Sequence, residues 1–149
     1  PRSTLFPYTT LFRSGQCDIL KISDNEIQWL TGEEDFTKGV HWILERYHIP
    51  LILVSMGREG SRAYYKDLIV EVKPFIQKNT IETTGAGDTF CACVLPYILE
   101  HGLTDLTEDG LKEMLTFANA AASIITTRKG ALRVMPEREE VEKLLSCFN

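Results

Sequence analysis

The chain has 149 residues, of which 44% are hydrophobic and 25% are charged, and its formal net charge at pH 7 is −5. This length is sufficient for one domain with its own core. The acidic balance, without a run rich in Lys and Arg, argues against a nucleic-acid partner, and no apolar stretch is long enough to cross a bilayer. The four cysteines form neither a CxxC pair nor a zinc pattern, so we expect reduced thiols in a cytoplasmic protein.

The start of the chain contains the stretch TLFPYTTLFRS, from Thr4 to Ser14. This stretch resembles a sequencing-library adapter translated in frame, and it lacks the layout of a signal peptide. Phe, Tyr and Thr favour strands, so a short native strand is the alternative. We therefore expect residues 1–16 to be a non-native lead, and residues 17–149 to be the C-terminal part of a longer protein.

The first predicted elements are a strand and a helix. The stretch CDILKIS, residues 17–23, predicts a short buried strand. Ser23 or Asp24 can then cap a helix that has Glu26 in its first turn. Gly32 interrupts this helix.

A second helix and three strands are predicted next. Apolar residues at helical spacing in 33–48 indicate a helix with one buried face. The continuous apolar run at 51–55 is typical of a strand that is covered on both faces. After a glycine-marked loop, residues 62–74 predict two short strands joined by a turn at 66–67.

The remainder of the chain predicts helices at about 86–100, 107–127 and 137–148. Strands and helices that alternate in this order indicate an α/β protein. No internal repeat, low-complexity tract or linker divides the chain after the lead, so we expect one piece of one domain.

The stretch IETTGAGDTF, from Ile81 to Phe90, carries the strongest chemical signal. Gly85 and Gly87 let the backbone turn and approach a ligand closely, and the N–H groups at a helix start form an anion site. Asp88 is unsuited to binding phosphate but is well suited to accept a proton from an attacking hydroxyl. Together these features favour phosphoryl transfer from a nucleotide to an alcohol. Taken alone, a GxGD pattern more often indicates an ordinary helix start, with Gly for the turn and Asp as a first-turn charge.

The longer string ETTGAGDTF resembles the DTxGAGD signature of the ribokinase-like, or phosphofructokinase-B-type, carbohydrate kinases. The resemblance covers about residues 17–146. It implies a three-layer α/β/α sandwich with a largely parallel sheet, incomplete in this chain, and ATP-dependent phosphorylation of a sugar hydroxyl. It also implies that Asp88 is the catalytic base and that the backbone of Gly85, Ala86, Gly87 and Asp88 forms the anion hole.

Two further stretches resemble the nucleotide side of that family. LVSMGREGS resembles a strand and loop near the ATP phosphates or ribose, which implies nucleotide contacts from Ser55, Gly57 and Gly60. FANAAAS resembles the helix beside the adenine, which implies a contact from Asn119. Without the resemblance, the two glycines indicate a simple turn and the asparagine an ordinary helical residue.

The resemblance also implies two metal sites. SDNEIQWLTG resembles the NxxE segment, whose glutamate supports Mg²⁺, so Glu26 takes that role; taken alone it is a first-turn charge. TRKGA, residues 127–131, resembles the loop that helps to hold a monovalent cation such as K⁺. Glu82 replaces the aspartate that usually begins the DTxGAGD signature, whose carboxylate takes part in binding this cation; the added methylene moves the carboxylate. Ser23 replaces the asparagine of NxxE, where serine can still hold a water.

Many fructokinase-like members of the family are similar around Glu26, so we expect fructose as the acceptor sugar. Ribose, a nucleoside or a keto-deoxy sugar acid are alternative acceptors. A nucleotide-binding fragment without catalysis and a non-enzymatic interaction module are competing hypotheses for the chain as a whole.

In the family, most sugar contacts and the lid come from the N-terminal part, and no sugar motif precedes Cys17. We therefore expect this chain to be inactive alone and to have an exposed sheet edge. Dimers in the family usually use the lid, so a homodimer is expected only of the full-length protein.

Overall fold

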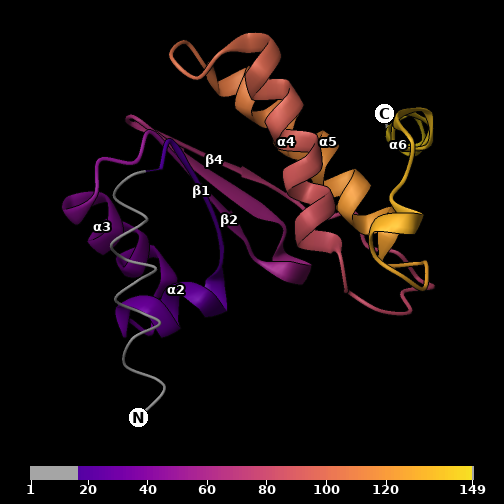
Figure 1. Ribbon diagram of the computed structural model, residues 1–149, viewed down its shortest axis with the longest axis horizontal. Helices are drawn as coiled ribbons and strands as arrows, with labels where there is room; N and C mark the ends of the chain where they lie inside the picture. The colour runs from indigo at the N-terminus through magenta and orange to yellow at the C-terminus, as the bar shows by residue number, and fades with distance from the viewer. Residues whose placement is uncertain (1–16, 149) are drawn as a thin grey trace.

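The computed structural model describes residues 17–148, and Figure 1 shows their arrangement. The predicted lead at 1–16 lies outside the described residues and stays a prediction. The elements are β1 (Ile19–Ser23), α2 (Asp24–Thr31), α3 (Phe36–Arg46), β2 (Leu51–Ser55), β3 (Ser61–Tyr65), β4 (Leu68–Val72), α4 (Ala86–His101), α5 (Glu108–Ile125) and α6 (Arg138–Ser146), with 3₁₀ turns at Gly57–Glu59 and Leu132–Val134.

The sheet has four strands in the order β1-β2-β3-β4. β1 and β2 are parallel, whereas β2–β3 and β3–β4 are antiparallel. The sheet of the described residues is therefore mixed, and the expectation of a largely parallel sheet is not met in this part. The reason is chain length between strands: α2 and α3 give β1 and β2 a long crossover, but β3 and β4 are joined by Lys66 and Asp67 alone, which permits only a hairpin.

Helices cover both faces of the sheet, as expected for a three-layer α/β/α arrangement (Figure 1). β2 is buried on both faces because it lies between two cores. Leu51 and Leu53 pack into the cluster under α4 and α5. Ile52 and Val54 pack into the cluster under α2 and α3. α6 lies outside these layers, where Val141 packs with the alanine-rich part of α5.

Local sequence signals explain where the helices begin and end. Ser23 and Glu26 form a reciprocal capping box at the start of α2, and Gly32 ends this helix in a left-handed conformation, with φ +77°. Asp35 caps α3 by accepting hydrogen bonds from backbone N–H groups. Thr107 caps α5, as its sequence predicts. No helix in the described part of the chain is both long and apolar enough to span a membrane.

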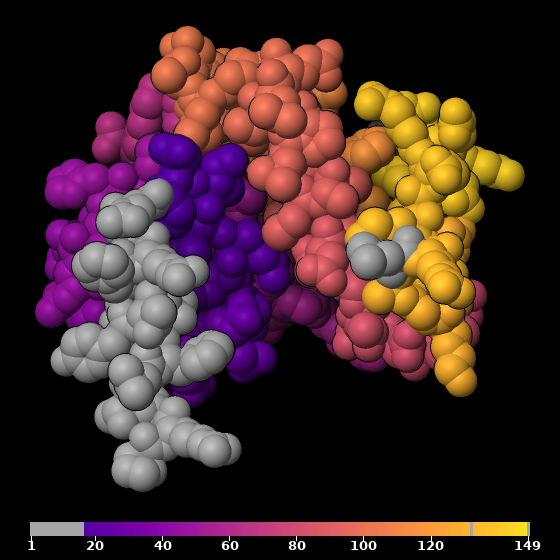
Figure 2. Space-filling view, viewed as in Figure 1, coloured from indigo at the N-terminus to yellow at the C-terminus, as the bar shows by residue number. Residues whose placement is uncertain are grey.

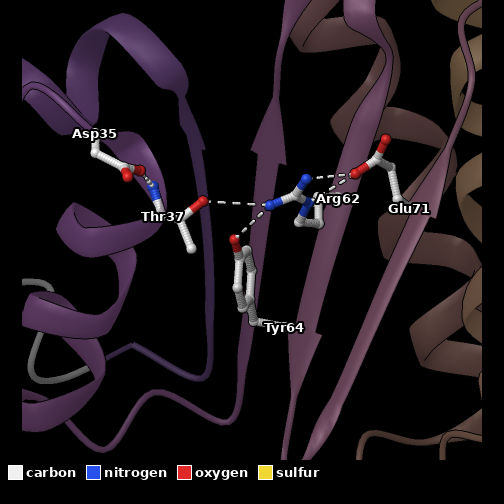
Figure 3. A network of polar contacts seen from close by, with 5 residues as sticks. All are labelled: Asp35, Thr37, Arg62, Tyr64 and Glu71. Carbon is white, nitrogen blue, oxygen red and sulfur yellow. Dashed lines mark hydrogen bonds and ion pairs between the residues drawn. The ribbon is translucent and has the colours of Figure 1, made fainter.

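A polar network joins α3 to the β3–β4 hairpin on the α2–α3 side of the sheet (Figure 3). Arg62 on β3 donates from Nε to Glu71 on β4 at 3.0 Å and also forms an ion pair with this carboxylate. Its Nη1 donates to Thr37 on α3 at 3.4 Å and to the Tyr64 hydroxyl at 3.3 Å. The guanidinium also lies over the Phe36 ring, at 5.1 Å from its centroid. This network fixes the hairpin against α3.

Candidate active site

The carboxyl ends of the two parallel strands form one side of the candidate site. β1 ends at Ser23 and β2 ends at Ser55, and these two residues are partners in the strand register. Ser55 is in turn the register partner of Ser61, the first residue of β3. Ser61 is fully buried and its Oγ has no hydrogen-bond partner among the described residues. A polar row at the carboxyl edge of parallel strands is where α/β proteins bind ligands.

The N-terminus of α4 forms the other side. Gly85 is the N-cap residue, with φ +83°, and no side chain caps the helix. The N–H of Ala86 donates to the Thr83 carbonyl at 3.2 Å. Within residues 17–148, no acceptor is found for the N–H groups of Gly87 and Asp88. Two donors at the positive end of a helix are therefore free to bind an anion.

Gly85 is required by both conformation and packing. A side chain at φ +83° would be strained, and a Cβ here would lie 3.2 Å from Ala131 Cα and 3.2 Å from Ile125 Cδ1. The turn that starts α4 therefore packs directly against the end of α5 and the loop that follows it.

Asp88 lies in the first turn of α4, and its side chain is exposed. In the described part of the chain, no hydrogen bond or ion pair engages its carboxylate. The carboxylate therefore stands beside the free N–H groups and is available to accept a proton. The roles of catalytic base and anion hole expected of the GAGD stretch stay predictions.

Glu26 has a structural contact that the family resemblance does not include. Its Oε2 accepts hydrogen bonds from the N–H and the Oγ of Ser23, both at 2.8 Å. The backbone hydrogen bond from Ser23 is the main cause of the lowered pKa of Glu26, and the nearby Lys21 lowers it further. One carboxylate oxygen therefore caps α2, and Oε1 is the atom left for a metal ion or its water.

Glu82 joins the segment before α4 to the loop after α5. Its Oε1 accepts a hydrogen bond from the Gly130 N–H at 2.9 Å. The N–H groups of Ile81 and Glu82 both donate to the Thr126 carbonyl, at 2.8 and 3.2 Å. The Glu82 carboxylate, one methylene longer than the aspartate expected there, thus contacts the 127–131 loop.

The two glycines predicted to contact nucleotide differ in their surroundings. Gly57 is exposed, with φ +53°, and a Cβ there would meet no atom within 4 Å. Gly60 is buried, and a Cβ there would lie 2.1 Å from the Val72 carbonyl oxygen. The space around Gly57 is therefore open to a ligand, whereas Gly60 permits the close approach of β3 and the end of β4.

Asn119 also contacts the end of β4. The residue is 8% exposed, and its Nδ2 donates to the carbonyls of Val72 and Lys73, both at 3.2 Å. Its amide therefore joins α5 to β4, which is a structural contact. The adenine contact expected of Asn119 stays a prediction.

Lys21 is a site residue that the sequence patterns do not single out. It lies on β1 two residues before Ser23 and two after Ile19, whose side chain packs in the cluster under α4 and α5. Its Nζ lies 3.1 Å from the position that a Cβ on Gly87 would occupy. In Figure 2 the indigo atoms of the N-terminal elements lie beside the salmon atoms of α4. The period of two along β1 is the signal that places Lys21 and Ser23 on one face.

The thiols near the site are poor nucleophiles. Burial raises the pKa of Cys91, and it raises the pKa of Cys93 to about 11. Cys93 also packs against the core under α4. Neither thiol is ionised near neutral pH, so the chemistry of the site depends on the carboxylate and the N–H groups.

Comparisons with known proteins agree with this geometry. A family model described as pfkB family carbohydrate kinase matches residues 8–138. The chain is 35% identical over 130 residues to probable fructokinase-4 of Arabidopsis thaliana and 36% identical over 130 residues to fructokinase-1 of Zea mays, and each match covers 87% of this chain and 40% of the relative. The chain thus spans about two fifths of the length of these curated relatives.

Solved structures show the same fold. Arabidopsis thaliana ribokinase complexed with ribose and ATP superposes with a TM-score of 0.72 at 31% identity, over 86% of this chain and 40% of that one. Fructokinase from Vibrio cholerae O395, in a form with bound fructose, ADP and calcium ion, gives a TM-score of 0.82 at 26% identity, over 93% and 44%. The fold is therefore ribokinase-like, and the chain belongs to the pfkB family of carbohydrate kinases.

Proposed function

We propose that the full-length protein carrying this chain transfers the γ-phosphoryl group of ATP to a primary hydroxyl of a sugar, with fructose as the preferred acceptor. The observation that carries the proposal is the start of α4, where the unpaired N–H groups of Gly87 and Asp88 adjoin the free Asp88 carboxylate. The identity of about 35% to fructokinases of Arabidopsis thaliana and Zea mays supports fructose.

Each group has a separate task in this reaction. Asp88 accepts the proton of the sugar hydroxyl as its oxygen attacks the γ-phosphorus. The N–H groups of Gly87 and Asp88 donate to the oxygens of the migrating phosphoryl group, on which negative charge spreads. Ser55 ends β2 and Gly57 follows it at the carboxyl edge, where the nucleotide phosphates would approach.

The residues present are compatible with a nucleotide-borne Mg²⁺. Among residues 17–148, no group of three or more His, Cys, Asp or Glu could hold a metal by itself. Mg²⁺ usually keeps several waters and binds through one or two carboxylates together with substrate phosphates. Oε1 of Glu26 would hold one such water. Bound there, the ion would neutralise charge on the ATP phosphates.

A K⁺ ion is proposed at the contact between Glu82 and the 127–131 loop. The carboxyl end of α5, which ends at Ile125, carries partial negative charge that favours a cation. The Glu82 carboxylate beside Gly130 adds a full negative charge. A cation held here would lie next to the turn at Gly85.

Glu82→Gln tests this proposal. The amide oxygen can still accept the hydrogen bond from Gly130, but the negative charge is lost, so we expect the concentration of K⁺ needed for half-maximal activity to rise about tenfold. The measurement is the rate in KCl titrations at constant ionic strength, with Glu82→Asp as the variant that keeps the charge. An identical K⁺ response in wild type and Glu82→Gln would show that the carboxylate is purely structural.

The function itself is tested by ADP release from the full-length protein with fructose, ribose, a nucleoside and a keto-deoxy sugar acid. We expect the largest kcat/KM with fructose. A larger kcat/KM with one of the other acceptors would instead indicate a kinase of the same family that acts on that acceptor. ATP binding without sugar-dependent ADP release would instead favour a nucleotide-binding protein without catalysis.

We propose a cytoplasmic location and, for the full-length protein, a homodimer. Cys91, Cys93 and Cys147 are free thiols, which is ordinary for a reducing compartment. ATP-dependent phosphorylation of a sugar also needs the cytoplasmic nucleotide pool.

A further inference from the structure

The ammonium group of Lys21 occupies a place where a positive charge is unfavourable in the protein alone. Its Nζ lies 3.1 Å from the position of a Cβ on Gly87, in the first turn of α4. The N-terminus of a helix carries about half a positive charge. Lysine at this end therefore destabilises the helix unless an anion lies between the ammonium and the helix start, and the Asp88 carboxylate of the same turn forms no ion pair with Lys21 among the described residues.

Lys21 also has no partner of its own among the described residues. The three ion pairs found there are all made by arginines, and no hydrogen bond of the described chain uses Lys21 Nζ. Glu26 lies near enough to interact electrostatically with Lys21, but its Oε2 accepts a hydrogen bond from the Ser23 N–H. Lys21 is only partly exposed, and a cation partly removed from water without a partner is costly.

We propose that Lys21 contacts the transferred phosphoryl group, on the side opposite to the N–H groups of Gly87 and Asp88. This inference rests on the proposed phosphotransfer. The bond between the sugar oxygen and the γ-phosphorus forms, the bond from that phosphorus to the β–γ bridging oxygen breaks, and ADP keeps the electron pair. The hydroxyl proton goes to Asp88, and Lys21 keeps its own proton and remains a point charge with three donors.

The position of Lys21 gives it a role in nucleotide selection. The γ-phosphoryl group is the one that must lie beside the Asp88 carboxylate, and Lys21 points at the same turn of α4. ADP lacks that group, so Lys21 stabilises bound ATP but not bound ADP. Gly87 contributes to this selection, because the absence of a Cβ leaves room for the Lys21 ammonium beside the start of α4.

The test is Lys21→Met in the full-length protein, which keeps the length of the side chain and removes the charge. We expect kcat to fall about 10²-fold, as for the loss of one preorganised donor. We expect the affinity for ATP to fall about tenfold and the affinity for ADP to change by less than about twofold. Lys21→Arg should recover part of the ATP preference. The matched control is Lys38→Met, at an exposed position of α3, which should alter neither affinity.

Calorimetric titrations with ATP and ADP, together with melting temperatures, separate the outcomes. A folded Lys21→Met protein with the wild-type ratio of ATP to ADP affinity would overturn the inference. If that variant does not fold, Lys21→Gln takes its place, because it also removes the charge but keeps a polar side chain; an unchanged ratio there overturns the inference equally. A wild type that binds nucleotide but phosphorylates no sugar overturns the proposed function alone, because the affinity ratio is measured without turnover.

Discussion

Asp88→Asn in the full-length protein is expected to lower kcat by about 10²–10⁴-fold, the range for removal of a general base. The amide has the same shape as the carboxylate but cannot accept the proton of the attacking hydroxyl. Because the N–H groups of Gly87 and Asp88 remain, the dissociation constant for ATP should change by less than about threefold. Single-turnover phosphorylation of fructose and calorimetric titration with ATP measure these two quantities separately.

Asp109→Asn is the matched control. Asp109 is also an exposed aspartate in the first turn of a helix, α5, so this substitution removes the same kind of helix-start charge away from the candidate site. It should leave kcat unchanged. Turnover that survives in Asp88→Asn would remove this residue as the base, and an equal loss in both variants would mean that the effect is a general weakening of helix starts.

The sequence predicts most elements of this fold because their signals are local. The capping box of Ser23 and Glu26, the strand at 51–55 and the turn at 66–67 each depend on a few neighbouring residues, and the structure confirms each of them. The overall direction of the strands is different. The local turn at 66–67 correctly predicts the β3–β4 hairpin, whereas the expectation of a largely parallel sheet came from the family as a whole and does not describe this part of it.

The residues of the candidate site also divide into those with local sequence signals and those that only the tertiary structure brings together. Asp88 and Gly85 are recognisable because the helix start and its chemistry lie within one short stretch. Lys21 is not, because its role depends on its Nζ lying near Gly87 at the start of α4, and these residues are far apart in the sequence. A strand pattern places Lys21 on the face of Ser23, but only the tertiary structure places Gly87 above it.

Gly60 is a second residue whose surroundings could not be inferred from the sequence, and it leads to the largest expected effect on stability. Its backbone has φ +102° and ψ −137°, a conformation that is essentially restricted to glycine. A Cβ would lie 2.1 Å from the Val72 carbonyl oxygen, and this backbone atom cannot move without disturbing β4 and its hydrogen bonds from Asn119. We expect Gly60→Ala to lower the free energy of unfolding by about 3–5 kcal/mol, from backbone strain and overpacking together.

Gly57→Ala is the control for this prediction because the two glycines share one loop. Gly57 has φ +53°, in the left-handed region, and no atom lies within 4 Å of the Cβ position. Its substitution should therefore cost only about 1–2 kcal/mol. Urea unfolding of the full-length protein measures both changes, and ATP titration measures any nucleotide contact. If Gly60 instead served the nucleotide alone, Gly60→Ala would keep wild-type stability and lose ATP affinity. Because a net stability of about 5–15 kcal/mol is typical, a loss of the expected size would leave Gly60→Ala only marginally folded and Gly57→Ala intact.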